Sequence, residues 1–105
     1  MAGAKVREDV LSLAKALRHR DRFIRRHAAA ALGGIGAEAA AAVEDLGGAV
    51  ADKDPEIAIR AAKALRRVGA DAVPYLGAAL AHPAVTVRRE AVWALKEFGT
   101  EALPA

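Results

Sequence analysis

The sequence has no cysteine and few aromatic residues, and both shortages exclude particular kinds of protein. Without cysteine, the 105 residues cannot form disulfides, a thiolate nucleophile or a zinc site with cysteine ligands. Aromatic residues make up 4% of the chain, and no alternating apolar pattern predicts a β-strand. No apolar run reaches the roughly 20 residues of a membrane-spanning helix. The lack of cysteine fits the reducing cytoplasm, where we expect the protein.

An excess of charge of one sign is also small. The chain has 16 basic and 13 acidic side chains, for a formal net charge of +3. This surplus allows weak association with anionic surfaces and does not require it. Hydrophobic residues at 54% exclude a disordered tail, and more than a quarter of all residues are alanine. The length suits one small domain, residues 1–105.

An internal repeat organises the chain. Residues 24–36, 57–69 and 87–99 align with apolar residues at i, i+4, i+8 and i+11, and each segment ends in glycine. This spacing marks one face of an α-helix, and a closing glycine is typical of a helix C-terminus. We call these segments the A helices and expect their first residues, Ile24, Ile57 and Val87, to be buried alike. Asp21 and Asp54 are the expected N-caps of the first two.

A second set of apolar columns lies between the A helices. Residues 10, 13 and 17 align with residues 43, 46 and 50 and with residues 73, 76 and 80, which predicts three B helices. Asp71 is the expected N-cap of the last one. A column of small residues, Ala14, Gly47 and Gly77, predicts close helix packing. The expected boundaries are a helix at 5–19, repeats at 21–52 and 54–82, and a partial repeat at 84–105.

The repeats resemble a known family. The segments HPAVTVRREAVWALKEFG and GADAVPYLGAAL follow the short, alanine-rich HEAT-like repeats of the phycobilisome-lyase type, and the resemblance covers about Val10 to Pro104. It implies an all-α fold, a right-handed α-solenoid of stacked antiparallel helix pairs, with about six helices and a C-terminal stub. In similar repeats an arginine, here Arg25 and Arg88, pairs with the aspartate before an A helix. Ala58 replaces that arginine in the middle repeat.

The resemblance implies a non-enzymatic scaffold that binds another protein. In the family the B helices line the concave side, and exposed aromatic residues are typical of binding hot spots. The predicted partner-binding residues are Ser12, Lys15, Phe23, Asp45, Tyr75 and Trp93.

The last A helix has no complete B helix after it in this sequence. We therefore expect an uncovered apolar end that binds a second copy of the chain and forms a homo-oligomer. Its predicted residues are Val87, Ala91, Leu95, Phe98 and Leu103. The alternative is that neighbouring repeats of a longer solenoid cover this end.

A basic cluster carries the second hypothesis, binding of nucleic acid or another polyanion. Its members are Arg18, Arg20, Arg22, Arg25 and Arg26. The competing interpretation is a solvated face whose arginine stems cover apolar surface. A weaker alternative, implied only by the resemblance, is an accessory subunit of a chromophore lyase.

No residue pattern predicts chemistry. His19 and His82 occupy equivalent repeat positions, but helices two repeats apart lie too far from each other to share a metal ion. Ser12 is the only serine and lies within a predicted helix. We expect no catalytic residue, metal site or cofactor.

Overall fold

Helices make up the regular structure of the chain. The computed structural model describes the backbone of residues 2–102 and the side chains of residues 5–98. Every regular element within that part is helical, which confirms the all-α prediction. The elements are α1 (Ala2–Ala16), α2 (Arg22–Ile35), the 3-10 helix η1 (Gly36–Ala42), α3 (Val43–Ala49), α4 (Pro55–Val68), the 3-10 helix η2 (Ala70–Leu76), α5 (Gly77–Leu80) and α6 (Val85–Ala102).

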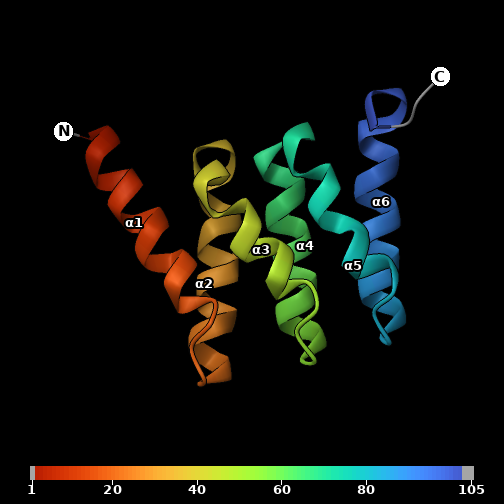
Figure 1. Ribbon diagram of the computed structural model, residues 1–105, viewed down its shortest axis with the longest axis horizontal. Helices are drawn as coiled ribbons and strands as arrows, with labels where there is room; N and C mark the ends of the chain where they lie inside the picture. The colour runs from red at the N-terminus through yellow and green to blue at the C-terminus, as the bar shows by residue number, and fades with distance from the viewer. Residues whose placement is uncertain (1, 103–105) are drawn as a thin grey trace.

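The helices form two layers. The A layer consists of α2, α4 and α6 side by side, and the B layer consists of α1, η1–α3 and η2–α5 (Figure 1). In the A layer α2 packs on α4 and α4 on α6, while in the B layer α1 contacts η1 and α3 contacts η2. The Cα atoms span 16 Å along the shortest axis. This thickness fits two layers, because packed helix axes lie about 8–10 Å apart and each helix has a Cα radius of about 2.3 Å.

Aspartate caps begin the first two A helices. A carboxylate oxygen of Asp21 accepts a hydrogen bond from the backbone N–H of Phe23 at 2.8 Å. The carboxylate of Asp54 accepts one from Glu56 at 3.0 Å. Each bond satisfies a donor that the first helical turn leaves unpaired. Both N-cap predictions are therefore confirmed.

Glycines end the same two helices. Gly36 and Gly69 have φ angles of 75° and 125°, which residues with a side chain rarely adopt. Their N–H groups donate to the carbonyls of Leu32 and Leu65 in the last helical turn. The two glycines turn the chain from each A helix into the B-layer segment that follows it.

The third A helix does not end at its glycine. α6 continues through Gly99 to Ala102, so the helix end expected at Gly99 is wrong. Glycine permits a positive φ but does not impose one, and the helical backbone simply continues.

Two B-layer segments are only partly α-helical. Each begins as a seven-residue 3-10 helix, η1 or η2, and becomes α-helical in α3 or α5. Because α5 has four residues, the described chain holds five α-helices longer than about one turn, rather than the six predicted. Pro74 contributes in η2, since it has no N–H to donate to the carbonyl four residues earlier. Asp71 lies within η2 and is not its N-cap, so that prediction is wrong.

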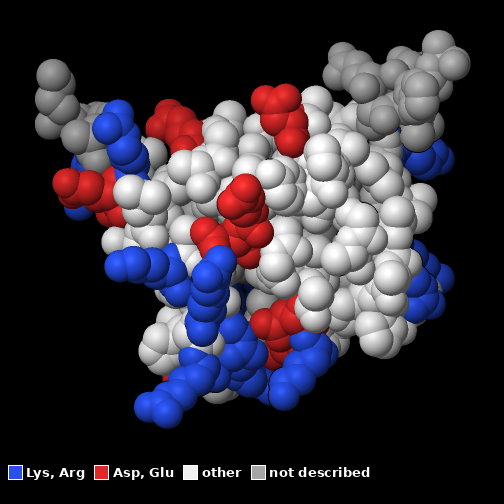
Figure 2. Space-filling view, in the orientation of Figure 1, with Lys and Arg blue, Asp and Glu red and all other residues white. Residues whose placement is uncertain are grey.

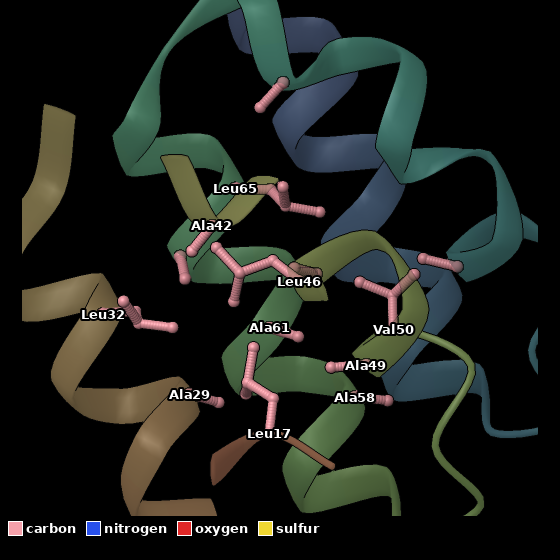
Figure 3. Close-up of a cluster of buried hydrophobic side chains, with 14 of the residues drawn as sticks. Leu17, Ala29, Leu32, Ala42, Leu46, Ala49, Val50, Ala58, Ala61 and Leu65 are labelled. Atoms are coloured by element: carbon pink, nitrogen blue, oxygen red, sulfur yellow. The ribbon is translucent and has the colours of Figure 1, made fainter. Parts of the chain in front are cut away.

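The core lies between the layers and is rich in alanine. In Figure 3, Leu46 and Ala49 of α3 lie beside Ala58 and Ala61 of α4, whose short side chains let the helices approach closely. The largest fully buried side chains are Val10, Leu32, Leu46, Val50, Ile57, Leu65, Leu76 and Val87.

Ile24, Ile57 and Val87, the first residues of the three predicted A segments, are not buried alike. Ile57 and Val87 have no exposed surface, whereas Ile24 is 38% exposed. The expectation of equivalent burial is therefore wrong for Ile24. The reason is its position in the row of A helices. α4 and α6 each pack on the A helix that precedes them in the chain, whereas the only described helix that precedes α2 is α1.

Candidate interaction surfaces

An arginine–aspartate pair joins the first two corners, which are the loops where the chain passes from the B layer to the A layer. Arg25 of α2 and Asp52, in the loop before α4, have side chains only 16% and 11% exposed. Nε of Arg25 donates to Oδ2 of Asp52 at 2.9 Å. Its Nη1 donates to the carbonyls of His19 and Arg20, both at 2.9 Å. Arg25 is thus fixed within the fold, as the family pattern predicts.

A histidine joins the second and third corners. Ala58, which replaces the family arginine in α4, is fully buried and offers no donor. Nε2 of His82 lies 2.8 Å from the carbonyl oxygen of Asp52, and its Nδ1 accepts from the N–H of Ala84 at 3.0 Å. Because Nδ1 accepts, Nε2 carries the hydrogen and donates. Arg88 donates to two carbonyls of the same corner.

The predicted basic cluster is divided among different contacts. Besides Arg25, Arg18 places Nη2 2.6 Å from Oδ1 of Asp45 in α3. Nε of Arg22 lies 3.7 Å from Asp54. Basic side chains gather with acidic ones between them at one edge of the B layer (Figure 2). Three of the five guanidinium groups therefore have carboxylate partners, which leaves less positive charge for a polyanion than the sequence indicates. Arg20 and Arg26, the other two members of the cluster, are exposed.

A hollow of about 530 Å³ lies on the B layer between α1 and α3. We call it the B-layer hollow. Leu11, 52% exposed, gives it an apolar wall, and the Arg18–Asp45 ion pair lies at its edge. Three predicted partner-binding residues, Ser12, Lys15 and Asp45, meet here. Its lining residues are Leu11, Ser12, Ala14, Lys15, Arg18 and Asp45.

Tyr75 lies outside this hollow and packs on a glycine. A Cβ added at Gly47 of α3 would stand 2.9 Å from Cδ1 of Tyr75 and 3.1 Å from its Cβ. The prediction of close packing is therefore confirmed at Gly47. At Gly77, an added Cβ would meet nothing within 4 Å, so there the prediction is wrong.

The other two predicted aromatic residues lie at opposite ends of the A layer. Phe23 of α2 is 61% exposed, and the guanidinium carbons of Arg22 and Arg26 lie 5.1 and 5.7 Å from its ring centroid. Trp93 of α6 is 66% exposed. The six predicted partner-binding residues thus belong to separate surfaces.

The predicted association end has different members in the structure. Val87 and Ala91 have no exposed surface and belong to the core, so their assignment to an association surface is wrong. Leu95 and Phe98 are half-buried, and Leu103 lies beyond the described part of the chain. The exposed large apolar residues of α6 are Val85, Val92 and Trp93.

A basic groove between α2 and α4 is absent from the sequence predictions. Two adjoining hollows on the A layer share Ala30 and Arg60. The spacing of residues 60, 63 and 67 puts three basic side chains on one helix face, so the signal was present in the sequence. We call the combined feature the A-layer groove. Its lining residues are Phe23, Arg26, His27, Ala29, Ala30, Gly33, Arg60, Lys63 and Arg67.

Neither a metal site nor a membrane span is found in the described chain. No three His, Asp or Glu side chains among those residues gather where they would hold a metal ion. His19, like His82, uses Nδ1 to accept a backbone N–H, that of Asp21 at 3.0 Å. None of the described helices is long and apolar enough to cross a membrane.

Comparison with known proteins supports the repeat. No curated protein gives a significant match to the chain. A family model described as HEAT repeats matches residues 43–105, which is more than half of the chain. With its paired layers and capped A helices, the chain belongs to the HEAT repeat family.

Proposed function

We propose that this protein is a non-enzymatic scaffold that binds another protein in the B-layer hollow. The observation that carries the proposal is an exposed leucine, Leu11, in a hollow bordered by polar side chains and an ion pair. Apolar anchors surrounded by a polar rim are typical of protein interfaces. HEAT repeats commonly mediate protein interactions, which supports the same conclusion.

We propose further that the two layers form part of a right-handed α-solenoid with the B layer on its concave side. The corner contacts support this arrangement, because Arg25 joins the first corner to the second and His82 joins the second to the third. Repeats stacked in this way contact only their neighbours, so the outer faces of both layers remain open to partners.

An affinity capture experiment with two matched variants tests the hollow. Leu11→Glu places a charge in the hollow, and Leu80→Glu places the same charge on an exposed leucine elsewhere in the B layer. We expect proteins captured by the wild type to be lost with L11E and retained with L80E. Circular dichroism establishes that both variants are folded. Capture that survives L11E would contradict the proposal.

A second candidate is association between copies through α6. Ala29 and Ala62 are fully buried, whereas Val92 at the equivalent position is 49% exposed beside Trp93. Together with the exposed Phe23 on α2, this gives apolar surface at both ends of the A layer, which suits a head-to-tail contact. Sedimentation velocity tests it: we expect the wild type to sediment faster as concentration rises and Trp93→Lys to remain monomeric. A wild type that stays monomeric at high concentration would refute the contact.

A further inference from the structure

We infer that the A-layer groove binds an acidic helix of a partner protein. The groove lies between α2 and α4, in the layer opposite the B-layer hollow. It therefore adds a second site to the proposed function and does not depend on the first. Arg26 comes from α2, and Arg60, Lys63 and Arg67 come from α4, so the positive charge belongs to both walls.

Positive charge in the groove exceeds the negative charge that the chain supplies. Oε2 of Glu56 lies 3.3 Å from Nη2 of Arg60. Nε of Arg60 is buried and has no hydrogen-bond partner among the described residues. Nη1 of Arg67 donates to the carbonyl of Gly33 at 3.4 Å, and Lys63 is exposed without an ion pair in the described chain. Lys63 and Arg67 are exposed, so a ligand with several carboxylates can pair with both of them.

The size of the groove matches about two turns of a helix. Residues 60 to 67 of α4 extend about 10 Å, because an α-helix rises about 1.5 Å per residue. Carboxylates at i, i+3 and i+7 of a partner helix have the same spacing as the three cations of α4. The lining residues Ala29, Ala30 and Gly33 have short side chains or none. Ala30 is the exposed one of these three, so a third helix can contact the groove there, as in other helix-in-groove complexes.

A nucleic acid suits this groove less well than an acidic helix. Single strands bind through bases stacked on aromatic rings, and Phe23, the aromatic residue of the groove, already has Arg22 and Arg26 against its ring. The net charge of +3 is also small for a protein that binds a continuous phosphate backbone.

Fluorescence anisotropy with a synthetic peptide tests the inference. The probe is a fluorescein-labelled, alanine-based helical peptide with glutamates at i, i+3 and i+7, and its comparison peptide has the same composition with the glutamates spread around the helix. The groove variant combines Arg26→Glu with Lys63→Glu. The matched control combines Arg7→Glu with Lys53→Glu, two exposed positions outside the groove with the same change in charge. Thermal melting establishes that both variants are folded.

We expect the groove variant to bind the peptide about tenfold more weakly, because two attractions become repulsions. The control should bind within about twofold of the wild type. The inference is overturned if the wild type does not bind the peptide, if both variants lose affinity equally, or if the comparison peptide binds as tightly. Tighter binding of DNA of similar length, lost in the groove variant, would assign the groove to nucleic acid instead. L11E should leave peptide binding unchanged, so the two sites can fail separately.

Discussion

At the scale of single residues, the adjacent glycines of α3 have different surroundings. A Cβ at Gly47 would stand 2.9 Å from the ring of Tyr75, whereas one at Gly48 would meet nothing within 4 Å. Alanine is favoured over glycine within a helix by about 1 kcal/mol, so Gly48→Ala should raise the free energy of unfolding by up to about 1 kcal/mol. Gly47→Ala should lower it by about 1–2 kcal/mol, because overpacking outweighs the helix gain. Urea denaturation measures both changes.

The ring of Tyr75 provides the control for Gly47. If the contact causes the loss, Gly47→Ala should cost much less stability in a Tyr75→Ala background, and a double-mutant cycle reports the difference. A Gly47→Ala variant as stable as Gly48→Ala would show that the ring moves aside freely.

Arg25 and Arg88 occupy the same column but have different partners. Arg25 bonds a poorly exposed carboxylate and two carbonyls, whereas the bonds of Arg88 go to two carbonyls. Arg25→Ala leaves Asp52 without its cation and should lower the free energy of unfolding by about 3 kcal/mol. Arg88→Ala should lower it by about 1–2 kcal/mol. Equal losses in chemical denaturation would show that the ion pair adds nothing.

At the scale of elements, His82 connects the loop before α4 with the loop before α6. Its two ring nitrogens bond the carbonyl of Asp52 and the N–H of Ala84, and the residue is 6% exposed. His82→Ala removes both bonds and should lower the free energy of unfolding by about 2–3 kcal/mol. The amide of Ala84 should also exchange its hydrogen faster.

Asparagine at the same position separates the two bonds of His82. Asp52 shows that a short side chain can accept the N–H two residues later, as it does from Asp54 at 2.9 Å. His82→Asn should therefore keep slow exchange at Ala84 while recovering about half of the stability lost in His82→Ala. Fast exchange in both variants would contradict this assignment.

The A and B segments were predictable from the sequence, but the 3-10 form of two B segments was not. Asp21 and Asp54 mark helix starts through a specific hydrogen bond, and that signal depends on residues two positions apart. An α-helix and a 3-10 helix differ by one residue in their bonding, and the apolar columns of the B segments fit both. Gly99 shows the same limit, because the residue type allows a turn that the backbone does not make.

The candidate sites were predictable where one segment supplies them. Ser12 and Lys15 lie on one helix face, and the family pattern predicts that Asp45 joins them on the same side, as it does in the B-layer hollow. The A-layer groove joins Arg26 with Lys63, which are far apart in the sequence and become neighbours only when α2 packs on α4. Conversely, Arg25 is next to Arg26 in the sequence but bonds Asp52 in the loop before α4.

At the scale of the whole molecule, position in the array decides what an equivalent residue contributes. Residues inside the array are covered from both sides, whereas those at its ends are covered from one. Val92 is therefore exposed where Ala29 and Ala62 are buried, and Ile24 is exposed where Ile57 is buried. Sequence columns alone cannot distinguish these cases.

Truncation of the two isoleucines tests this dependence on position. Ile57→Ala removes a side chain with no exposed surface and leaves a cavity, which should lower the free energy of unfolding by about 3–4 kcal/mol. Ile24→Ala removes a partly exposed side chain and should cost only about 1 kcal/mol in dilute protein. If copies cover Ile24 at higher concentration, the cost of Ile24→Ala should rise with protein concentration while that of Ile57→Ala stays constant. Calorimetry over a hundredfold range of protein concentration distinguishes an exposed end from one covered by a second copy. Equal losses of unfolding free energy for both substitutions at every concentration would show that position in the row of repeats does not matter.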